Sequence, residues 1–367
     1  MLSKISNHQT ETTTTIKPPR DSNLELFRIL AMLAIVAHHY VVNSGLTSYS
    51  PLIQDQFSLK SIFYLIFGAF GKTAINCFVL ITGYYMCTSQ ITLKKFLKLF
   101  FEIMFYKISI YLIFVFSGYE AFTLKNCLKE LAPVYAVDKN FVGCYLVFFL
   151  LIPFLNVLVQ KMNEKIHKNS LYLLLFVFTI LGSIPNFKIT FNYVTWFCVL
   201  YIIASYIRFY PRPICQNVKF WLSIFLSSLA LAIASIVILA FIGEKINKFI
   251  PYFFVADSNK ILAVILGISS FMLFKNLKMK YYPFINTIAA TTFGVLLIHA
   301  NSNTMRTWLW KDICDNIYFY NSQYFFLHAI LTVLIIFTIC SIIDYLRIRF
   351  VEIPTFNFLY KKNIISK

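Results

Sequence analysis

Long runs of apolar residues, broken by short polar and basic stretches, fill the chain from residue 24 to residue 346. About 20 apolar residues in helical form cross the hydrocarbon core of a bilayer. The pattern predicts about ten membrane-spanning helices, at 24–43, 61–86, 96–117, 141–160, 170–185, 191–208, 219–242, 260–275, 283–300 and 324–346. The fifth and sixth are short, and they either span the bilayer or form a re-entrant pair around Pro185. Barrels of the outer-membrane type alternate polar and apolar residues in short segments, which this chain lacks. The sequence therefore predicts an all-α, polytopic integral membrane helix bundle.

Composition and charge place this bundle in the membrane with a definite orientation. Of the 367 residues, 59% are hydrophobic and 13% charged, against about a quarter charged in soluble domains. The net charge of +18 would suit nucleic acid, but the basic residues lie in clusters between apolar runs. Basic residues favour one set of loops by about two to one, which is typical of cytoplasmic loops. We therefore expect both termini in the cytoplasm and no nucleic-acid partner.

Three regions follow from the same pattern. Residues 1–21 are polar and rich in threonine, without the apolar core of a signal peptide, and are expected to be a disordered cytoplasmic tail. Residues 22–350 form the predicted transmembrane domain, and residues 351–367 a cytoplasmic C-terminal tail. The eight cysteines lie mostly within apolar segments and lack CxxC spacing, so neither a disulfide framework nor a metal site is expected.

Arg28 and His39 lie eleven positions apart in the first predicted helix. At about 100° per residue they share one face, with about 16 Å of rise between them, whereas His38 points about 80° away. Ionisable groups inside a span mark functional sites by default. Each has a plainer interpretation: Arg28 extends to the headgroups, and His39 is an interior histidine with a satisfied partner.

The first helix also carries a start signal. The stretch Ser22-Asn23-Leu24-Glu25 predicts a capping box, in which Ser22 and Glu25 bond to each other's backbone amides. Glu25 precedes Arg28 by three residues, so the two side chains are expected to pair.

The stretch from Glu25 through Arg28 to His39 resembles the signature of the membrane-bound acyltransferase family 3, bacterial O-acyltransferases that modify surface polysaccharides. The first helix of that family carries an arginine, ten residues and then a histidine, usually with an acidic residue three before the arginine. On this resemblance His39, and not His38, takes the family's histidine role. Further stretches resemble the family in the same order: Asn76–Tyr84, the basic cluster Lys94, Lys95 and Lys98, Tyr145–Asn156, Phe293–His299 and Glu352-Ile353-Pro354. Phe141 stands where the family often has a tryptophan.

The resemblance implies a membrane O-acyltransferase that most simply moves an acetyl group from cytoplasmic acetyl-CoA to a hydroxyl of a surface polysaccharide or its precursor. The donor, acetyl-CoA or another short acyl-CoA, is a substrate, and no permanently bound cofactor or metal is expected. The expected partners are acyl-CoA, a polysaccharide or lipid-linked glycan and the lipid bilayer. The expected location is the plasma membrane of a bacterium. The sequence does not specify the acyl group, the sugar or the oligomeric state.

The expected catalytic residues are His39, Arg28 and Glu25. Arg28 suits a phosphate of coenzyme A because guanidinium offers forked donors and a permanent charge. Lys94, Lys95 and Lys98 either extend that cofactor-binding site or are ordinary cytoplasmic loop charges. His39 either deprotonates the acceptor hydroxyl or carries the acyl group itself, and both roles need a neutral imidazole.

A second set of residues is expected to contact the substrate. His299 ends a helix at a depth similar to that of His39, so the two side chains are placed to meet. Lys72 and Asn76 share a helix face, and Lys72 is predicted to line a cavity because an unpaired lysine within a span is costly. Glu102 and Lys107 pair with each other or with neighbours instead. Glu352 is expected to be a surface carboxylate at a helix end.

Two other functions compete with the enzyme. A transporter or flippase for a lipid-linked sugar or another solute would explain the spans and the internal charges, but it predicts repeated halves, which the sequence lacks. A partner protein in surface-polymer synthesis, without chemistry of its own, is the third possibility.

Overall fold

In a computed structural model, the described residues are 21–135, 137, 141–187, 189 and 192–364, and every regular element among them is helical. This confirms the predicted all-α class. The predicted tail at residues 1–21 lies outside the described residues except for Asp21. The predicted C-terminal tail includes a helix, α17.

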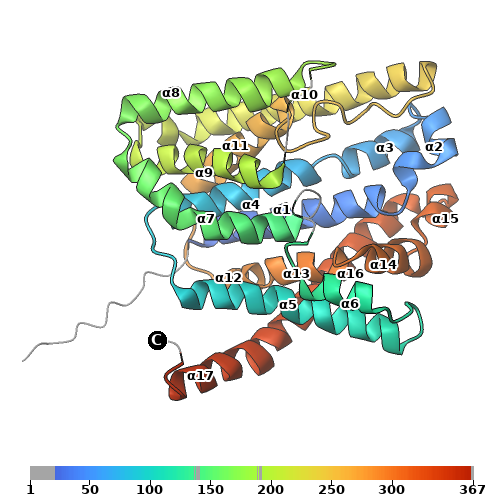
Figure 1. The fold of residues 1–367 in the computed structure, drawn as a ribbon. Coiled ribbons are helices and arrows are strands. Elements are labelled where there is room, and N and C mark those ends of the chain that lie inside the picture. Colours follow the sequence, from blue (N-terminus) through green and yellow to red (C-terminus); the bar gives the residue numbers. More distant parts are fainter. Residues whose placement is uncertain (1–20, 136, 138–140, 188, 190–191, 365–367) are drawn as a thin grey trace, which may run out of the picture.

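The helices form a bundle of long rods, with most of the short helices at one end (Figure 1). The long elements are α1 (Ser22–Val42), α3 (Leu59–Phe67) followed by α4 (Gly71–Met86), α5 (Leu93–Phe116), α7 (Phe141–Lys161), α8 (Glu164–Leu175), α9 (Tyr193–Phe209), α10 (Val218–Lys245), α11 (Ile261–Asn276), α12 (Pro283–Ala290) followed by α13 (Thr292–His299), and α16 (Phe325–Arg347). The short ones are α2 (Ser50–Gln54), α6 (Leu124–Leu131), α14 (Asn303–Thr307), α15 (Asn316–Asn321) and α17 (Ile353–Lys361).

Each of the ten predicted spans is helical, but length and apolar composition support fewer crossings. Seven helical stretches in the described residues are long and apolar enough to cross a membrane, and an eighth is obtained if a bent pair is counted. That pair is Pro283–His299 and Asn303–Ile313, which meet at 94°. Two more apolar helices, α9 and α11, have only 17 and 16 residues. The count of ten therefore stays a prediction.

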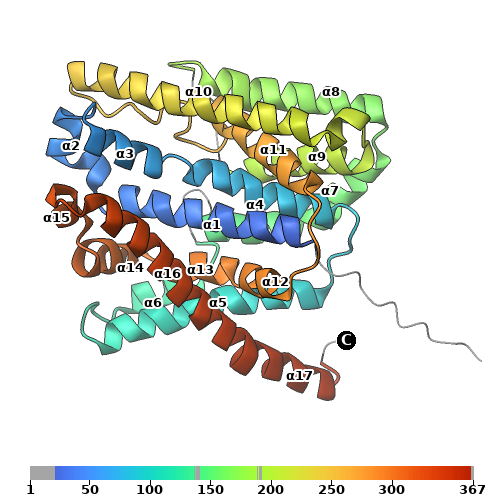
Figure 2. The same cartoon turned by 180° about the vertical axis from the view of Figure 1, so that it is seen from behind.

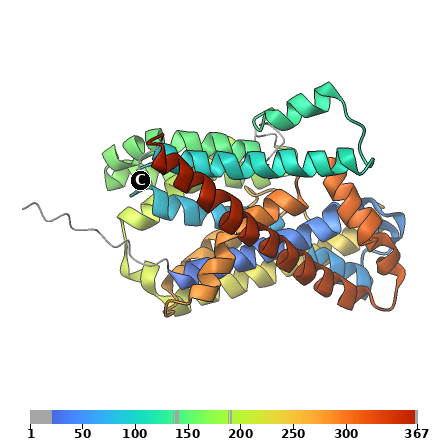
Figure 3. The same cartoon turned by 90° about the horizontal axis from the view of Figure 1, so that it is seen from below.

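The long helices alternate in direction between two ends of the bundle (Figures 1 and 2). We call the end at which α1 begins the Ser22 end, and the opposite end, at which α1 finishes, the Asn43 end. Helix α17 lies at the Ser22 end, and α2, α6, α14 and α15 lie at the Asn43 end (Figure 1). Helix α16 crosses the bundle obliquely, as Figure 3 shows. Helix α1 packs against α4, α12 and α16, and α4 also packs against α9 and α11, so these two helices form the centre.

The predicted capping box at the start of α1 is wrong. Asp21 is the N-cap residue and makes no side-chain capping bond. The Ser22 hydroxyl instead donates to Asn286 Oδ1 at 2.9 Å and accepts from the Tyr282 amide at 2.9 Å. The Asn23 amide donates to three backbone carbonyls at the end of α11. Ser22 and Asn23 therefore bond to distant groups in place of the local backbone amides of a capping box. These bonds join the start of α1 to the segment between α11 and α12.

Candidate active site

Helix α1 carries Arg28 near the Ser22 end and His39 near the Asn43 end. The helix is continuous from Ser22 to Val42, so the predicted shared face and the rise of about 16 Å apply. Arg28 Nη1 lies 3.2 Å from Glu25 Oε2, which confirms the expected pairing. His39 lies in the last turn of the helix, beside a cavity.

The side chains of His39 and His299 meet, as their similar depths predicted. His39 Nδ1 lies 2.9 Å from His299 Nε2. The other nitrogen of His299, Nδ1, lies 2.6 Å from the carbonyl oxygen of Val295. Helix α13 places His299 behind His39, and its side chain is fully buried.

These two contacts fix the protons of the neutral pair. A carbonyl oxygen only accepts, so His299 Nδ1 carries a hydrogen and donates to Val295. Nitrogen Nε2 of the neutral His299 ring is then an acceptor, and His39 Nδ1 must donate to it. The remaining nitrogen, Nε2 of His39, holds the free lone pair, and it has no hydrogen-bond partner within the part of the chain that the structure describes. The pair thus presents one basic nitrogen in a fixed tautomer.

The cavity beside His39 has a volume of about 640 Å³. Its walls come from α1, α4, α5, α7, α9, α13, α14 and the segment 249–256. Most of the lining is apolar or aromatic, and three cationic side chains reach it: Lys72, Lys107 and Arg306. The described lining contains no carboxylate. Lys72 lines the cavity, as predicted, whereas the sequence interpretation missed Arg306.

The two lysines of the cavity already have partners. Lys72 Nζ donates to the Tyr193 hydroxyl at 2.7 Å. Lys107 Nζ lies 2.6 Å from Glu130 Oε2 in α6. Lys107 therefore pairs with a neighbour and not with Glu102, one of the two alternatives that the sequence left open.

His38 lines the same cavity, but its ring is held differently. Its Nδ1 lies 2.6 Å from the Gly68 carbonyl oxygen, to which it donates. A Cβ added at Gly71 would lie 2.4 Å from His38, so the ring is packed directly against the start of α4. His38 therefore fastens α1 to the connection between α3 and α4.

Asn76 does not line the cavity. Its side chain is fully buried, with Nδ2 donating to the Ser258 carbonyl at 2.7 Å and Oδ1 accepting from Trp196 Nε1 at 2.9 Å. Residues four apart on a helix differ by about 40° in direction, and the longer Lys72 side chain reaches the cavity while Asn76 faces α9 and α11. This placement gives Asn76 a packing role and offers no substrate contact.

The three lysines expected at the coenzyme site contact other groups. Lys98 Nζ lies 2.6 Å from Glu352 Oε1, and Lys95 Nζ donates to the Gln90 carbonyl at 2.7 Å. Lys94 Nζ lies 4.7 Å from the centre of the Tyr360 ring. No contact joins them to Arg28 in the described structure, so their binding of acyl-CoA stays a prediction.

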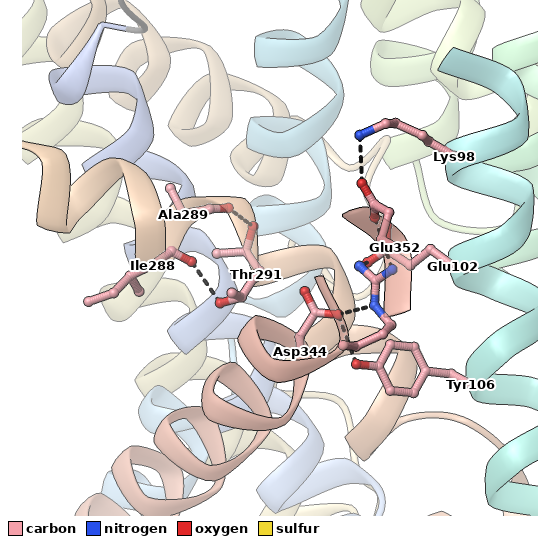
Figure 4. A network of polar contacts seen from close by, with 10 residues as sticks. Lys98, Glu102, Tyr106, Ile288, Ala289, Thr291, Asp344 and Glu352 are labelled. Carbon is pink, nitrogen blue, oxygen red and sulfur yellow. Dashed lines mark hydrogen bonds and ion pairs between the residues drawn. The ribbon is translucent and has the colours of Figure 1, made fainter. Parts of the chain in front are cut away.

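A buried ionic cluster lies apart from the histidines, between α5 and α16 (Figure 4). At its centre Arg347 contacts three carboxylates: Asp344 at 2.7 Å, Glu352 at 3.0 Å and Glu102 at 3.2 Å. The Tyr106 hydroxyl donates to Asp344 Oδ1 at 2.8 Å. Asp344 is fully buried and Arg347 almost so.

This cluster corrects the expectation for Glu352. A π-helical turn, Ile348–Glu352, joins α16 to α17 and turns the carboxylate inward, where it is buried between Lys98 and Arg347. The sequence interpretation singled out neither Asp344 nor Arg347. The only local signal was the spacing of three between two opposite charges at the end of a span.

A family model described as an acyltransferase domain matches residues 21–345. The matched region begins before α1 and ends within α16, so it includes Arg28, His39 and His299. No curated protein and no solved structure matches the chain.

Proposed function

Because this chain belongs to acyltransferase family 3, we propose that it is a membrane O-acyltransferase that moves an acetyl group from acetyl-CoA to a hydroxyl of a surface polysaccharide or its lipid-linked precursor. The family predicted from the sequence is confirmed, and the apolar helices identify a membrane protein. The observation that carries the proposal is the His39–His299 pair, which leaves one basic nitrogen on a histidine that lines a cavity of substrate size.

The pair suits proton transfer from an acceptor hydroxyl. His39 Nε2 takes the hydroxyl proton while the oxygen attacks the thioester carbonyl. The new carbon–oxygen bond forms, the carbon–sulfur bond breaks, and the proton passes from His39 to the departing thiolate. The charge that develops on His39 is supported by His299 Nε2, which accepts from Nδ1. Attack of His39 Nε2 on the thioester, giving an acylated histidine, uses the same free nitrogen and is the alternative route.

The donor side of the proposal places coenzyme A at the Ser22 end. Arg28 lies there on the face of α1 that leads to His39, about 16 Å along the axis. Its guanidinium would hold a phosphate of coenzyme A, with the acyl arm running along α1 toward His39. The excess of basic residues in the loops at the Ser22 end supports a cytoplasmic location for this end, where acetyl-CoA is made.

The acceptor side of the proposal places the sugar at the Asn43 end. A second, smaller cavity of about 210 Å³ lies there, and Asn301 borders both cavities. Its lining is mostly polar and includes Glu120, Asn126, Ser302 and Thr304. Carboxylates, amides and hydroxyls are the groups that bond to sugar hydroxyls. An acceptor glycan would thus reach His39 from the opposite end to the donor.

The test is acetyl transfer from labelled acetyl-CoA in membranes that contain His39→Ala. Loss of a positioned general base lowers the rate about 10²- to 10⁴-fold. The matched control is His38→Ala, which removes an adjacent imidazole that is bonded to backbone, and its effect should be much milder. Mass spectrometry of surface glycans from the same cells identifies the acyl group and the acceptor. Full activity of a correctly inserted His39→Ala variant would remove His39 from the mechanism, and transport of a solute without acylation would favour a transporter.

A further inference from the structure

Arg306 lines the cavity beside His39 without an acidic partner. No carboxylate lies within ion-pair distance of its guanidinium among the described residues. Its Nε atom is buried and makes no hydrogen bond. Nη1 and Nη2 make only long contacts, with Asn303 Oδ1 at 3.4 Å and the Ala300 carbonyl at 3.3 Å. A largely buried guanidinium with so few partners is costly unless a ligand completes it.

The rest of the cavity does not balance this charge. Lys107 is neutralised by Glu130, whereas the hydrogen bond of Lys72 within the described part of the chain goes to the neutral hydroxyl of Tyr193. With no carboxylate in the described lining, Lys72 and Arg306 leave two positive charges on one mostly apolar cavity. Low-dielectric walls strengthen the attraction of such a cavity for an anion.

The position of Arg306 assigns the anion to one substrate. The 94° bend after His299 turns α14 across the Asn43 end, and α14 holds Arg306 there. Arg28, the residue proposed to hold a phosphate of coenzyme A, lies at the Ser22 end of α1. An anion at Arg306 is therefore on the acceptor side of His39, and Asn301 connects this region with the second cavity. The two carboxylates of that cavity are already bonded, Glu130 to Lys107 and Glu120 to Asn126 and Thr304.

We propose that the acceptor is an anionic sugar, whose carboxylate or phosphate is held by Arg306 and Lys72 while His39 receives the proton of a nearby hydroxyl. This inference rests on the proposed function and adds the chemical class of the acceptor. Arg306 acts as the specificity residue, since its forked donors match both oxyanions. The anion also fixes which hydroxyl faces His39, because the charge contact orients the ring.

The experiment measures binding of glucuronate, glucose 1-phosphate and glucose to the purified full-length protein in lipid nanodiscs. At least one of the two anions should bind about 10-fold more tightly than glucose, and Arg306→Gln should remove that preference. The two anions distinguish a carboxylate from a phosphate as the recognised group. The matched control is Lys311→Gln, which removes one positive charge from an exposed position on the segment after α14 and should keep the preference.

Three results would overturn the proposal: no measurable preference for either anion, a preference that survives in Arg306→Gln, or a loss of acetyl-CoA binding in Arg306→Gln in place of a loss of sugar binding. The last result would assign Arg306 to the donor. Binding does not require catalysis, so the two proposals fail separately. An anion preference in a protein that transfers no acetyl group would contradict the proposed function alone.

Discussion

At the scale of single residues, one hydrogen bond between two imidazoles decides which nitrogen of His39 is basic. His299 receives the Nδ1 proton of His39 and is itself fixed by the Val295 carbonyl. In the proposed reaction His299 is therefore a positioning residue, which would act on the acyl transfer through His39, and it is not among the described residues that line the cavity.

Replacing His299 tests this role. His299→Leu removes the acceptor, so His39 is no longer held in one tautomer. The value of kcat should fall about 10-fold or more, with the 10²- to 10⁴-fold contribution of a positioned base as the upper bound. His299→Gln keeps an acceptor oxygen and should recover part of the rate. The measurement is kcat and KM for acetyl-CoA in proteoliposomes. A purely structural role would instead lower the amount of folded protein without changing kcat per folded molecule.

The sequence predicted the positions that follow from regular helix geometry. It missed the side chains whose hydrogen-bond partners lie far away in the sequence. Helix rise and rotation placed Arg28 and His39 on one face, and helix depth placed His299 beside His39. The local rule failed for Ser22, whose hydroxyl bonds to a distant amide and side chain. For Asn76, the spacing of four placed it on the same helix face as Lys72. Spacing alone does not reveal that its side chain bonds to Ser258 and Trp196.

At the scale of helices, one close approach fixes how α13 meets α16. A Cβ added at Gly294 would lie 2.2 Å from the Asp344 carboxyl carbon. The glycine thus lets the fully buried Asp344 reach both Tyr106 and Arg347. The lack of a side chain at Gly294 in α13 thus leaves room for the carboxylate of Asp344 in α16.

Gly294→Ala should therefore push α13 and α16 apart and lower stability by about 1–3 kcal/mol, the usual cost of overpacking. The measurement is the midpoint of thermal unfolding in detergent. Ala290→Val adds bulk at an exposed position on the preceding helix and should change the midpoint little. An unchanged midpoint for Gly294→Ala would mean that the two helices have room to separate.

The bend after His299 shows the limit of prediction at this scale. Hydropathy identified the apolar segment 283–300, because transfer free energy depends on composition. It gave no element for 303–313, where Arg306, Lys311 and Asp312 stand among tryptophans. At the start of the new helix the Ser302 side chain accepts from the Met305 amide, and the helix runs at 94° to the preceding one.

At the scale of the whole molecule, the proposed function has the two substrates entering from opposite ends. Sequence charge predicts that both termini lie in the cytoplasm, and the proposal builds on this orientation and on the alternating directions of the long helices. The number of crossings was less predictable, because α9 and α11 are short and their tilt is set by neighbours.

Arg28→Lys tests the donor end. Lysine keeps the charge but lacks the forked donors, so KM for acetyl-CoA should rise about 10-fold with a small change in kcat. Kinetics in proteoliposomes provide both values. Arg212→Lys is the control, because Arg212 lies after α9 at the same end of the bundle and pairs with the exposed Glu164. If KM stays unchanged, Arg28 does not contact the donor.

The ionic cluster of α5 and α16 also has a consequence for biosynthesis. Glu102 is made early, whereas its partner Arg347 follows some 245 residues later. At roughly 5–20 residues per second, the ribosome needs about 12–49 s to reach that arginine. During this interval the third apolar helix holds a carboxylate whose permanent counter-ion does not yet exist. When α16 is made, Arg347 supplies this counter-ion to Glu102. The last long helix thus completes the polar contacts of α5, one of the first helices to be made.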